Sequence, residues 1–273
     1  MKQDSNEIQN SIRLVSPKGN WNGNMKSSDT ALRAPVIVGP GRVGRSLAAA
    51  LPDADLRGRE ADLGDLSGRV VILCVPDSEI EALADRIGQA GSAPSLAGHT
   101  SGATSLGVLS GSRADGVFSV HPLQTVPDGD TDLGGCPAAI AGDSPPALEF
   151  ARSLATSAGM VAFEIAEEDR AAYHAAASVA SNFLITVEQT ASEMLAGISV
   201  ENPRQVLEPL VRRSLENWLD RGPEALTGPI ARGDETTVEA HRNELSERWP
   251  ELLGFYDALA AQTRSMAMSG KRR

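Results

Sequence analysis

The stretch that decides the fold is Gly39-Pro40-Gly41-Arg42-Val43-Gly44, a GxGxxG hexamer. The apolar run 36–38 precedes it, and residues 42–51 are compatible with a helix. In a strand–loop–helix setting the first glycine permits a tight turn, the second lets the backbone approach a pyrophosphate, and the third permits close packing of helix on strand. The N-terminus of the helix attracts the phosphate charge. The hexamer predicts a dinucleotide-binding unit, the alternative being an ordinary turn without a ligand.

Apolar runs and helical segments alternate after this loop. We predict strands at 54–56, 69–75, 95–97, 117–120 and 138–141, with a helix over 78–87. Within the strand predicted at 69–75, residues 70–75 are all apolar, as is typical of a strand covered on both faces. Alternating strands and helices indicate a parallel sheet. The predicted fold class is therefore α/β, with a Rossmann dinucleotide-binding domain over residues 35–166.

From about residue 167 onward the pattern becomes helical. We predict an alanine-rich helix over 170–196, a helix from Asn202-Pro203 to about 219 that Pro209 kinks, a helix capped by Asp234 and ending at 248, and a last helix over 250–268. These helices predict an all-helical C-terminal domain over 167–270. Residues 1–34 lack periodicity and are expected to form a flexible tail.

Composition excludes several classes of protein. The 273 residues are 41% hydrophobic and 22% charged, which argues against a disordered chain, and no apolar run approaches the length of a membrane span. A net charge of −11 argues against nucleic-acid binding. Cys74 and Cys136 have no metal-type spacing, Cys74 is expected to be a buried thiol, and the tail has no secretory signal. We expect a cytoplasmic protein with no membrane partner.

The choice of cofactor depends on residues about twenty positions after the hexamer. Arg57 and Arg59 follow the predicted strand there, flanked by Asp55 and Glu60. A basic pair would bind the 2′-phosphate of NADP, so the sequence favours NADP over NAD. The alternative is two solvated arginines beside two acidic residues.

Polar residues also follow the other predicted strands, and ligands of open α/β sheets bind beyond the carboxyl ends of strands. His99 and His121 each begin such a loop, and for either one alone a structural hydrogen bond is as plausible as a functional contact. Their recurrence at equivalent places favours function. The cofactor contacts expected here are Val75, Pro76 and Ser101, and the substrate contacts are His121 and Gln124.

The long helix carries His174, Ser178, Ser181 and Asn182 at spacings that place them along one face among alanines. A histidine there could give a proton to a carbonyl oxygen while hydride arrives at the carbon, and Asn182 could hydrogen-bond the same oxygen. Ser181 is expected to contact the substrate. The alternative is a set of hydrogen bonds between helices.

The order of motifs resembles a known family. GPGRVG, VILCVPD, HTSG, SVHPLQT, AYHAAASVASN and LTGPIARGD resemble the Rossmann-like proteins that carry the "domain of unknown function 2520" module, over about residues 35–268. More distantly the layout is similar to ketopantoate reductases, pyrroline-5-carboxylate reductases and β-hydroxyacid dehydrogenases. Those families join a dinucleotide-binding domain to a helical one and often dimerise through the helices, so the resemblance implies a homodimer.

The resemblance also implies roles for single residues. In two of the related families a helix of the second domain carries Lys-x3-Asn; here His174 stands at the lysine, Ser178 at the asparagine and Asn182 one turn later. An acidic neighbour among residues 167–169 could raise the pKa of His174. Arg232, in the TGPIARGD loop, could hold a substrate carboxylate, or Thr227 and Asp234 could simply end one helix and cap the next.

The function expected from these features is NADPH-dependent reduction of a small carbonyl substrate, such as a 2-oxo acid of the ketopantoate kind. His174, Ser178 and Asn182 would form the catalytic group. One alternative is a non-catalytic NADP sensor, favoured by the missing lysine, and another is an imine reductase of the pyrroline-5-carboxylate reductase type. The four histidines match no metal motif, so no metal is expected.

Overall fold

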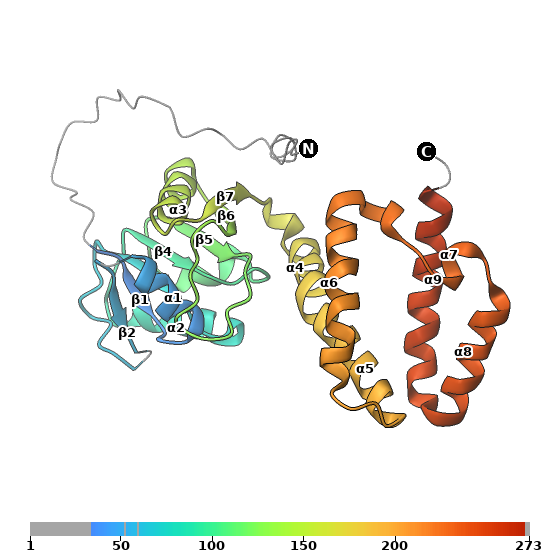
Figure 1. Ribbon diagram of the computed structural model, residues 1–273. Helices are drawn as coiled ribbons and strands as arrows, with labels where there is room; N and C mark the ends of the chain where they lie inside the picture. The colour runs from blue at the N-terminus through green and yellow to red at the C-terminus, as the bar shows by residue number, and fades with distance from the viewer. Residues whose placement is uncertain (1–33, 52, 59, 271–273) are drawn as a thin grey trace, which may run out of the picture. The chain divides into compact units, whose positions relative to one another are not determined.

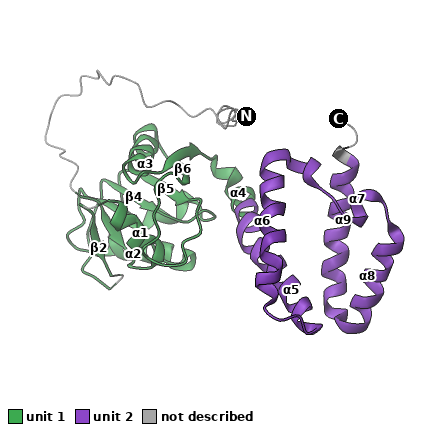
Figure 2. Cartoon of the chain, in the orientation of Figure 1, with its two compact units in different colours: residues 1–174 green, residues 175–273 purple. Residues whose placement is uncertain are grey.

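The computed structural model describes residues 34–51, 53–58 and 60–270, so that nearly all of the expected tail, and Arg59, lie outside the described residues. The chain forms two compact units, of which the first ends at His174 and the second begins at Ala175 (Figure 2). Each unit is described by itself below.

The first unit is built on a seven-stranded sheet with the strand order β2-β1-β3-β4-β5-β6-β7 (Figure 1). The predicted α/β fold is confirmed, and the glycine loop follows strand β1 as expected. The strands are β1 Val36–Val38, β2 Asp55–Arg57, β3 Val70–Leu73, β4 Leu96–His99, β5 Val117–Pro122, β6 Pro137–Gly142 and β7 Val161–Glu164.

The predicted parallel sheet is confirmed for all pairs of neighbouring strands except one. Strands β5 and β6 are antiparallel, with Val120 opposite Ile140, whereas all the other neighbours are parallel. A parallel neighbour needs a long crossover, usually a helix, and residues 123–136 between β5 and β6 contain none. Helix α3 (Pro145–Ser157) and strand β7 were not predicted from the sequence.

Helices α1 (Arg42–Ala50), α2 (Asp77–Gln89) and α3 cover the sheet, and the core has two layers. Ile37, Ile72 and Phe118 pack in one cluster, whereas their neighbours along the strands, such as Val38 and Val71, pack in the other. Side chains alternate across a strand, so both faces of the central strands are buried, as the apolar run predicted. Burial also raises the pKa of the Cys74 thiol to about 12, which keeps it protonated.

The regular elements of the second unit, within the described residues, are all helices. Helix α4 (Arg170–Ser178) begins in the first unit and ends in the second, where one π-helical turn (Val179–Phe183) follows it. No described helix is long and apolar enough to cross a membrane. The other helices are α5 Leu184–Gly197, α6 Pro203–Arg221, which runs through Pro209, α7 Pro229–Arg232, α8 Glu235–Arg248 and α9 Leu253–Gly270.

The glycine loop is held by close approach of α1 to β1 and β3. A Cβ atom on Gly44 would lie 2.0 Å from the carbonyl oxygen of Gly39. One on Gly39, whose φ is +114°, would lie 2.4 Å from the oxygen of Cys74. Both positions therefore require glycine for packing, whereas a Cβ on Gly58 meets nothing within 4 Å.

We expect Gly44→Ala to destabilise the first unit by about 3 kcal/mol, because backbone must move to admit the methyl group. Gly58→Ala is the matched control and should change the free energy of unfolding by less than about 0.5 kcal/mol. Urea unfolding followed by circular dichroism measures both. Equal effects of the two variants would contradict this account of the loop.

His99 ends strand β4 and is fully buried. Burial, and then the positive charge of Arg170, lower its pKa to about 4 from 6.5. Between these two values the unfolded chain binds a proton that the folded chain does not. The stability that neutral His99 provides is therefore complete above about pH 6.5 and is lost as the pH falls toward 4.

We expect the free energy of unfolding of the wild-type protein to fall on acidification from pH 6.5 to pH 4. In His99→Gln the decrease should be smaller by about 3 kcal/mol, because one pKa unit corresponds to about 1.4 kcal/mol. Denaturant titrations at a series of pH values measure this difference. Identical pH profiles of the two proteins would show that His99 is not the proton-sensitive group.

Candidate functional site

A pocket of about 280 Å³ lies beyond the carboxyl ends of the central strands. It brings the first turn of α1 and the start of α2 together with the loops after β4 and β5 and with His174 of α4. Six residues predicted as site residues line it: Arg42, Val43, Ser101, His121, Gln124 and His174. The pocket also includes Asp77, Thr100, Gly102, Pro122 and Val126, which carried no predicted role.

A second pocket of about 460 Å³ lies over the glycine loop. Gly41 precedes α1 without a side-chain cap, the first turn has no acidic residue, and a Cβ on Gly41 would approach nothing closer than 3.9 Å. The backbone N–H groups of this turn are thus open to an anion, and the space fits the pyrophosphate of a dinucleotide. The lining residues are Gly39, Pro40, Gly41, Gly58, Glu60, Cys74, Val75 and Pro76.

His121 and Tyr173 form a hydrogen-bonded pair beside the first pocket. The distance from His121 Nδ1 to Tyr173 Oη is 2.7 Å. Burial, and then the neighbouring His174, lower the pKa of His121 to about 4, and burial raises the pKa of Tyr173 to about 12. Both side chains are therefore neutral near pH 7. The ring of His174 lies 5.9 Å from that of His121.

Two side-chain pairs fasten the start of α4 to strand β5. Arg170, only 2% exposed, donates to Ser119 Oγ at 2.6 Å, and Tyr173 bonds His121. Residues three apart share a helix face and residues two apart share a strand face, so the pairs are consecutive contacts of the same two surfaces. Glu167, considered as a partner for His174, accepts from Arg170 Nε at 2.6 Å.

Gly102 allows the two imidazoles to approach each other. A Cβ atom at this position would lie 2.9 Å from His121 Nδ1 and 2.9 Å from His174 Nδ1. Any side chain on residue 102 would therefore push at least one ring aside, so the HTSG motif contributes space to the pocket.

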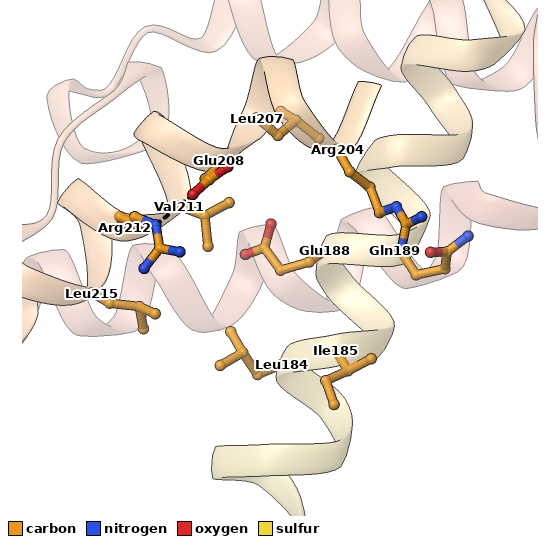
Figure 3. Close-up of a pocket in the computed structure, with 10 residues that line it drawn as sticks. All are labelled: Leu184, Ile185, Glu188, Gln189, Arg204, Leu207, Glu208, Val211, Arg212 and Leu215. Atoms are coloured by element: carbon orange, nitrogen blue, oxygen red, sulfur yellow. Dashed lines mark hydrogen bonds and ion pairs between the residues drawn. The ribbon is translucent and has the colours of Figure 1, made fainter. Parts of the chain in front are cut away.

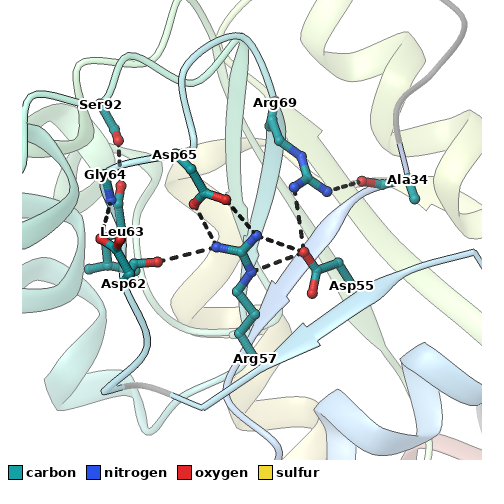
Figure 4. A network of polar contacts seen from close by, with 9 residues as sticks. All are labelled: Ala34, Asp55, Arg57, Asp62, Leu63, Gly64, Asp65, Arg69 and Ser92. Atoms are coloured by element: carbon teal, nitrogen blue, oxygen red, sulfur yellow. Dashed lines mark hydrogen bonds and ion pairs between the residues drawn. The ribbon is translucent and has the colours of Figure 1, made fainter.

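Arg57 does not line either pocket, and its donors are occupied (Figure 4). Its Nε and Nη2 donate to Asp55 at 3.0 and 2.7 Å. Its Nη1 and Nη2 donate to the two carboxylate oxygens of Asp65 at 2.6 and 2.9 Å, and Nη1 also reaches the backbone oxygen of Asp62 at 3.2 Å. The hydrogen bonds to Asp65 and Asp55 raise the pKa of Arg57 above its usual range. The predicted free basic residue is thus held between two carboxylates.

Other predicted residues have local roles or belong to the second unit. Ser101 Oγ accepts from the backbone nitrogen of Thr104 at 3.0 Å, and Asp234 accepts from that of Thr237 at 3.1 Å, which makes it the cap of α8. Three predicted residues lie in the π-helical turn or just before it, and one ends α7. That these four residues contribute to the pocket remains a prediction: Ser178, Ser181, Asn182 and Arg232.

The π-helical turn changes the expected stripe of polar residues. A π turn holds more residues than an α turn, so Ser181 and Asn182 do not continue the regular α-helical spacing from His174. Tyr173 and Asp77 were missed as site residues although each stands next to a residue that was named, because only contacts in space reveal their roles. No group of three or more His, Cys, Asp or Glu residues in the described part of the chain could hold a metal ion.

Comparison with known proteins identifies one domain family in the chain and solved structures of similar fold. Residues 136–263 match the family described as a domain of unknown function, DUF2520. No sequence among the curated proteins matches the chain significantly.

Three solved structures illustrate the likeness in fold. A candidate NADP oxidoreductase from Bacteroides fragilis is 21% identical, with 85% of this chain and 98% of that chain covered and a TM-score of 0.71. A Thermotoga maritima protein is 23% identical, with 88% and 100% covered and a TM-score of 0.72. The pyrroline carboxylate reductase of Plasmodium falciparum, solved with NADP bound, is 13% identical, with 86% and 98% covered and a TM-score of 0.54. The chain therefore contains a DUF2520 domain and has the fold of Rossmann-like proteins with a helical C-terminal region.

Proposed function

We propose that the protein is an NADPH-dependent oxidoreductase that reduces the carbonyl group of a small polar compound such as a 2-oxo acid. The observation that carries the proposal is one pocket with Arg42 and Val43, from the helix after the glycine loop, and the imidazoles of His121 and His174 in its wall. The names of two structures of similar fold, an NADP oxidoreductase and a reductase with bound NADP, agree with this class.

The residues around the glycine loop fit a nicotinamide dinucleotide. The open backbone N–H groups after Gly41 would hold the pyrophosphate, and Val75 and Pro76 would contact the remainder of the cofactor. When bound, the nicotinamide supplies a hydride to the substrate carbon. The two imidazoles would then face the negative charge that develops on the substrate oxygen.

Residues of the second unit complete the proposal. Asn182 would orient the carbonyl group, Ser178 and Ser181 would contact the substrate, and Arg232 would bind its carboxylate bidentately. His174 would protonate the oxygen. Reduction of an imine needs no proton at oxygen, so His174→Ala should impair a carbonyl reductase far more than an imine reductase, and a cofactor sensor would show no turnover at all.

The preference for NADP rests on the bond between Arg57 and Asp65. The Asp65 side chain is 57% exposed and occupies the guanidinium with both oxygens, as a phosphate does. We infer that the 2′-phosphate displaces this carboxylate, while Asp55 keeps Arg57 in place.

Two variants at this bond should act in opposite directions on NADPH affinity, measured by fluorescence titration. We expect Arg57→Ala to weaken NADPH binding about tenfold and Asp65→Asn to strengthen it severalfold, with NADH affinity unchanged in both. Asp62→Asn is the matched control, because only its backbone oxygen touches Arg57. Absence of binding by either cofactor at millimolar concentration would overturn the proposed function. Equal changes for NADPH and NADH would overturn only the preference for NADP.

We also propose that the protein is a homodimer, because the second unit lacks a core of its own. Its fully buried apolar residues within the described part are Val238, Leu245 and Ala260. Helix α6, with 19 residues, contains no buried residue. A domain of this size needs more buried apolar surface to remain folded. A second copy is the one partner that is always present at equal concentration.

A groove of about 450 Å³ between α5 and α6 is the surface that we assign to the dimer (Figure 3). Leu184 and Ile185 of α5 line it opposite Val211 and Leu215 of α6. Its charged residues balance, whereas the whole chain carries a net charge of −11. A surface with both signs of charge can face its own two-fold copy without net repulsion. The charged residues are Glu188, Arg204, Glu208 and Arg212.

Sedimentation equilibrium should give twice the chain mass of 28.6 kDa. Ile185→Glu should give a monomer, because the 65% exposed side chain would place a charge at the apolar contact. Val161→Glu, at a 40% exposed position of the first unit, is the control and should leave the dimer intact. A monomeric wild-type protein at micromolar concentration would contradict the proposal.

A further inference from the structure

The two tyrosines of the chain each bond a histidine, but in different settings. Tyr173 Oη lies 2.7 Å from His121 Nδ1 in the wall of the site pocket. Tyr256 Oη lies 2.9 Å from His241 Nδ1 in the second unit, between α8 and α9. The first pair therefore has a place at the site, and the second provides an internal comparison.

Relative acidity favours one direction for the hydrogen bond at the site. Within the described residues the half-buried Tyr173 Oη makes no hydrogen bond other than the one to His121 Nδ1. A phenol hydroxyl is a stronger donor than a neutral imidazole N–H, and a neutral imidazole nitrogen is a stronger acceptor than a phenol oxygen. The hydroxyl therefore donates and Nδ1 accepts. A neutral imidazole carries one N–H group, so its proton is then on Nε2.

The other ring nitrogen of His121, Nε2, makes no hydrogen bond to any described residue. The His121 ring lines the pocket, so the Nε2–H group is free to bond a ligand there. The ring cannot turn freely, because Gly102 lies against its Nδ1 edge and Tyr173 contacts it edge-on, with ring centres 5.6 Å apart. Arg170 fixes the helix that carries Tyr173 through its bond to Ser119.

We propose that His121 is a catalytic residue of the reduction, as a neutral donor whose Nε2–H bonds the substrate oxygen, and that Tyr173 is the positioning residue that sets its tautomer. This inference rests on the proposed function. As the substrate carbon gains a hydride from the reduced nicotinamide, the π-electron pair of the carbonyl moves to oxygen, and the N–H group of His121 stabilises that charge. His121 keeps its proton. The alkoxide becomes an alcohol by taking one proton, delivered from solvent through His174.

This role differs from that of a charged acid. A neutral N–H donor stabilises the oxyanion without passing its proton on, so His121 needs no titration near pH 7. His174 also lines the pocket, and its buried Nδ1 has no partner in the described part of the chain, so no hydrogen bond assigns its ring to another task. Two neighbouring imidazoles thus take separate tasks, one as a fixed dipole and one as a proton carrier.

The tautomer can be observed in the full-length protein without cofactor. Two-bond proton–nitrogen spectra of the histidine-labelled chain, assigned with His121→Gln, should show His121 at pH 7 as the neutral Nε2–H tautomer with a hydrogen-bonded Nδ1. Tyr173→Phe should remove that hydrogen bond from the spectrum and leave His241 unchanged. Tyr256→Phe, the matched control, should do the reverse. An imidazolium or an Nδ1–H tautomer at His121 in the wild-type protein would overturn the proposal.

Kinetics provide the second readout. With NADPH and a 2-oxo acid that the enzyme reduces, His121→Leu should lower kcat about a hundredfold, and His121→Gln, which keeps an N–H donor, about tenfold. Tyr173→Phe should lower kcat about tenfold with little change in KM, and Tyr256→Phe should not change it. An unchanged kcat in Tyr173→Phe would overturn the positioning role. If no cofactor binds, the proposed function fails while the spectrum still decides the tautomer.

Discussion

The buried guanidinium of Arg170 is the interaction on which the site depends. A buried charge is stable only when it is paired and hydrogen-bonded. Arg170 is paired with Glu167 through Nε and hydrogen-bonded to Ser119 through Nη2, while its buried Nη1 has no partner among the described residues. Glu167 in turn accepts from the backbone nitrogen of Leu106 at 2.7 Å. One ion pair therefore joins the start of α4, strand β5 and the loop after β4. Tyr173 and His174 follow on the next turn, so their positions over His121 are consequences of this anchor.

The fold could be predicted as far as local pattern determines it. The glycine hexamer between an apolar run and a helix indicated β1 and α1, and the apolar run 70–75 indicated a strand covered on both faces. The direction of β6 could not be predicted in this way, because it depends on a connection of 14 residues without a helix between β5 and β6. Helix α3 was missed because its two initial prolines read as a loop, although proline is favoured in the first turn of a helix.

Several residues that lie near the site could be predicted from the sequence, but the contacts that each of them makes could not. The sequence placed the glycine loop and His121 after predicted strands, and the carboxyl ends of parallel strands lie at one edge of a sheet. His174 was assigned to the site through its helix face and the family resemblance. The partner of each residue could not be inferred. Arg170 reads as one more solvated charge in a helix, yet it is buried, and Arg57 reads as a free basic residue, yet Asp65, eight positions later, occupies it. Such pairings depend on loops whose course the local sequence does not determine.

If an acidic chain is to bind an acidic cofactor, as we propose for this one, it needs attraction that does not depend on net charge. The net charge of −11 repels a dinucleotide at long range, but physiological salt screens this repulsion beyond about 8 Å. Within that distance the backbone N–H groups after Gly41, an α1 without acidic residues in its first turn, and Arg42 in the adjoining pocket present positive potential. Asp65 pairs with Arg57, the cation that the 2′-phosphate would take over under the proposed function. The affinity proposed for this site would therefore come from fixed local dipoles, which a change in overall surface charge would scarcely alter.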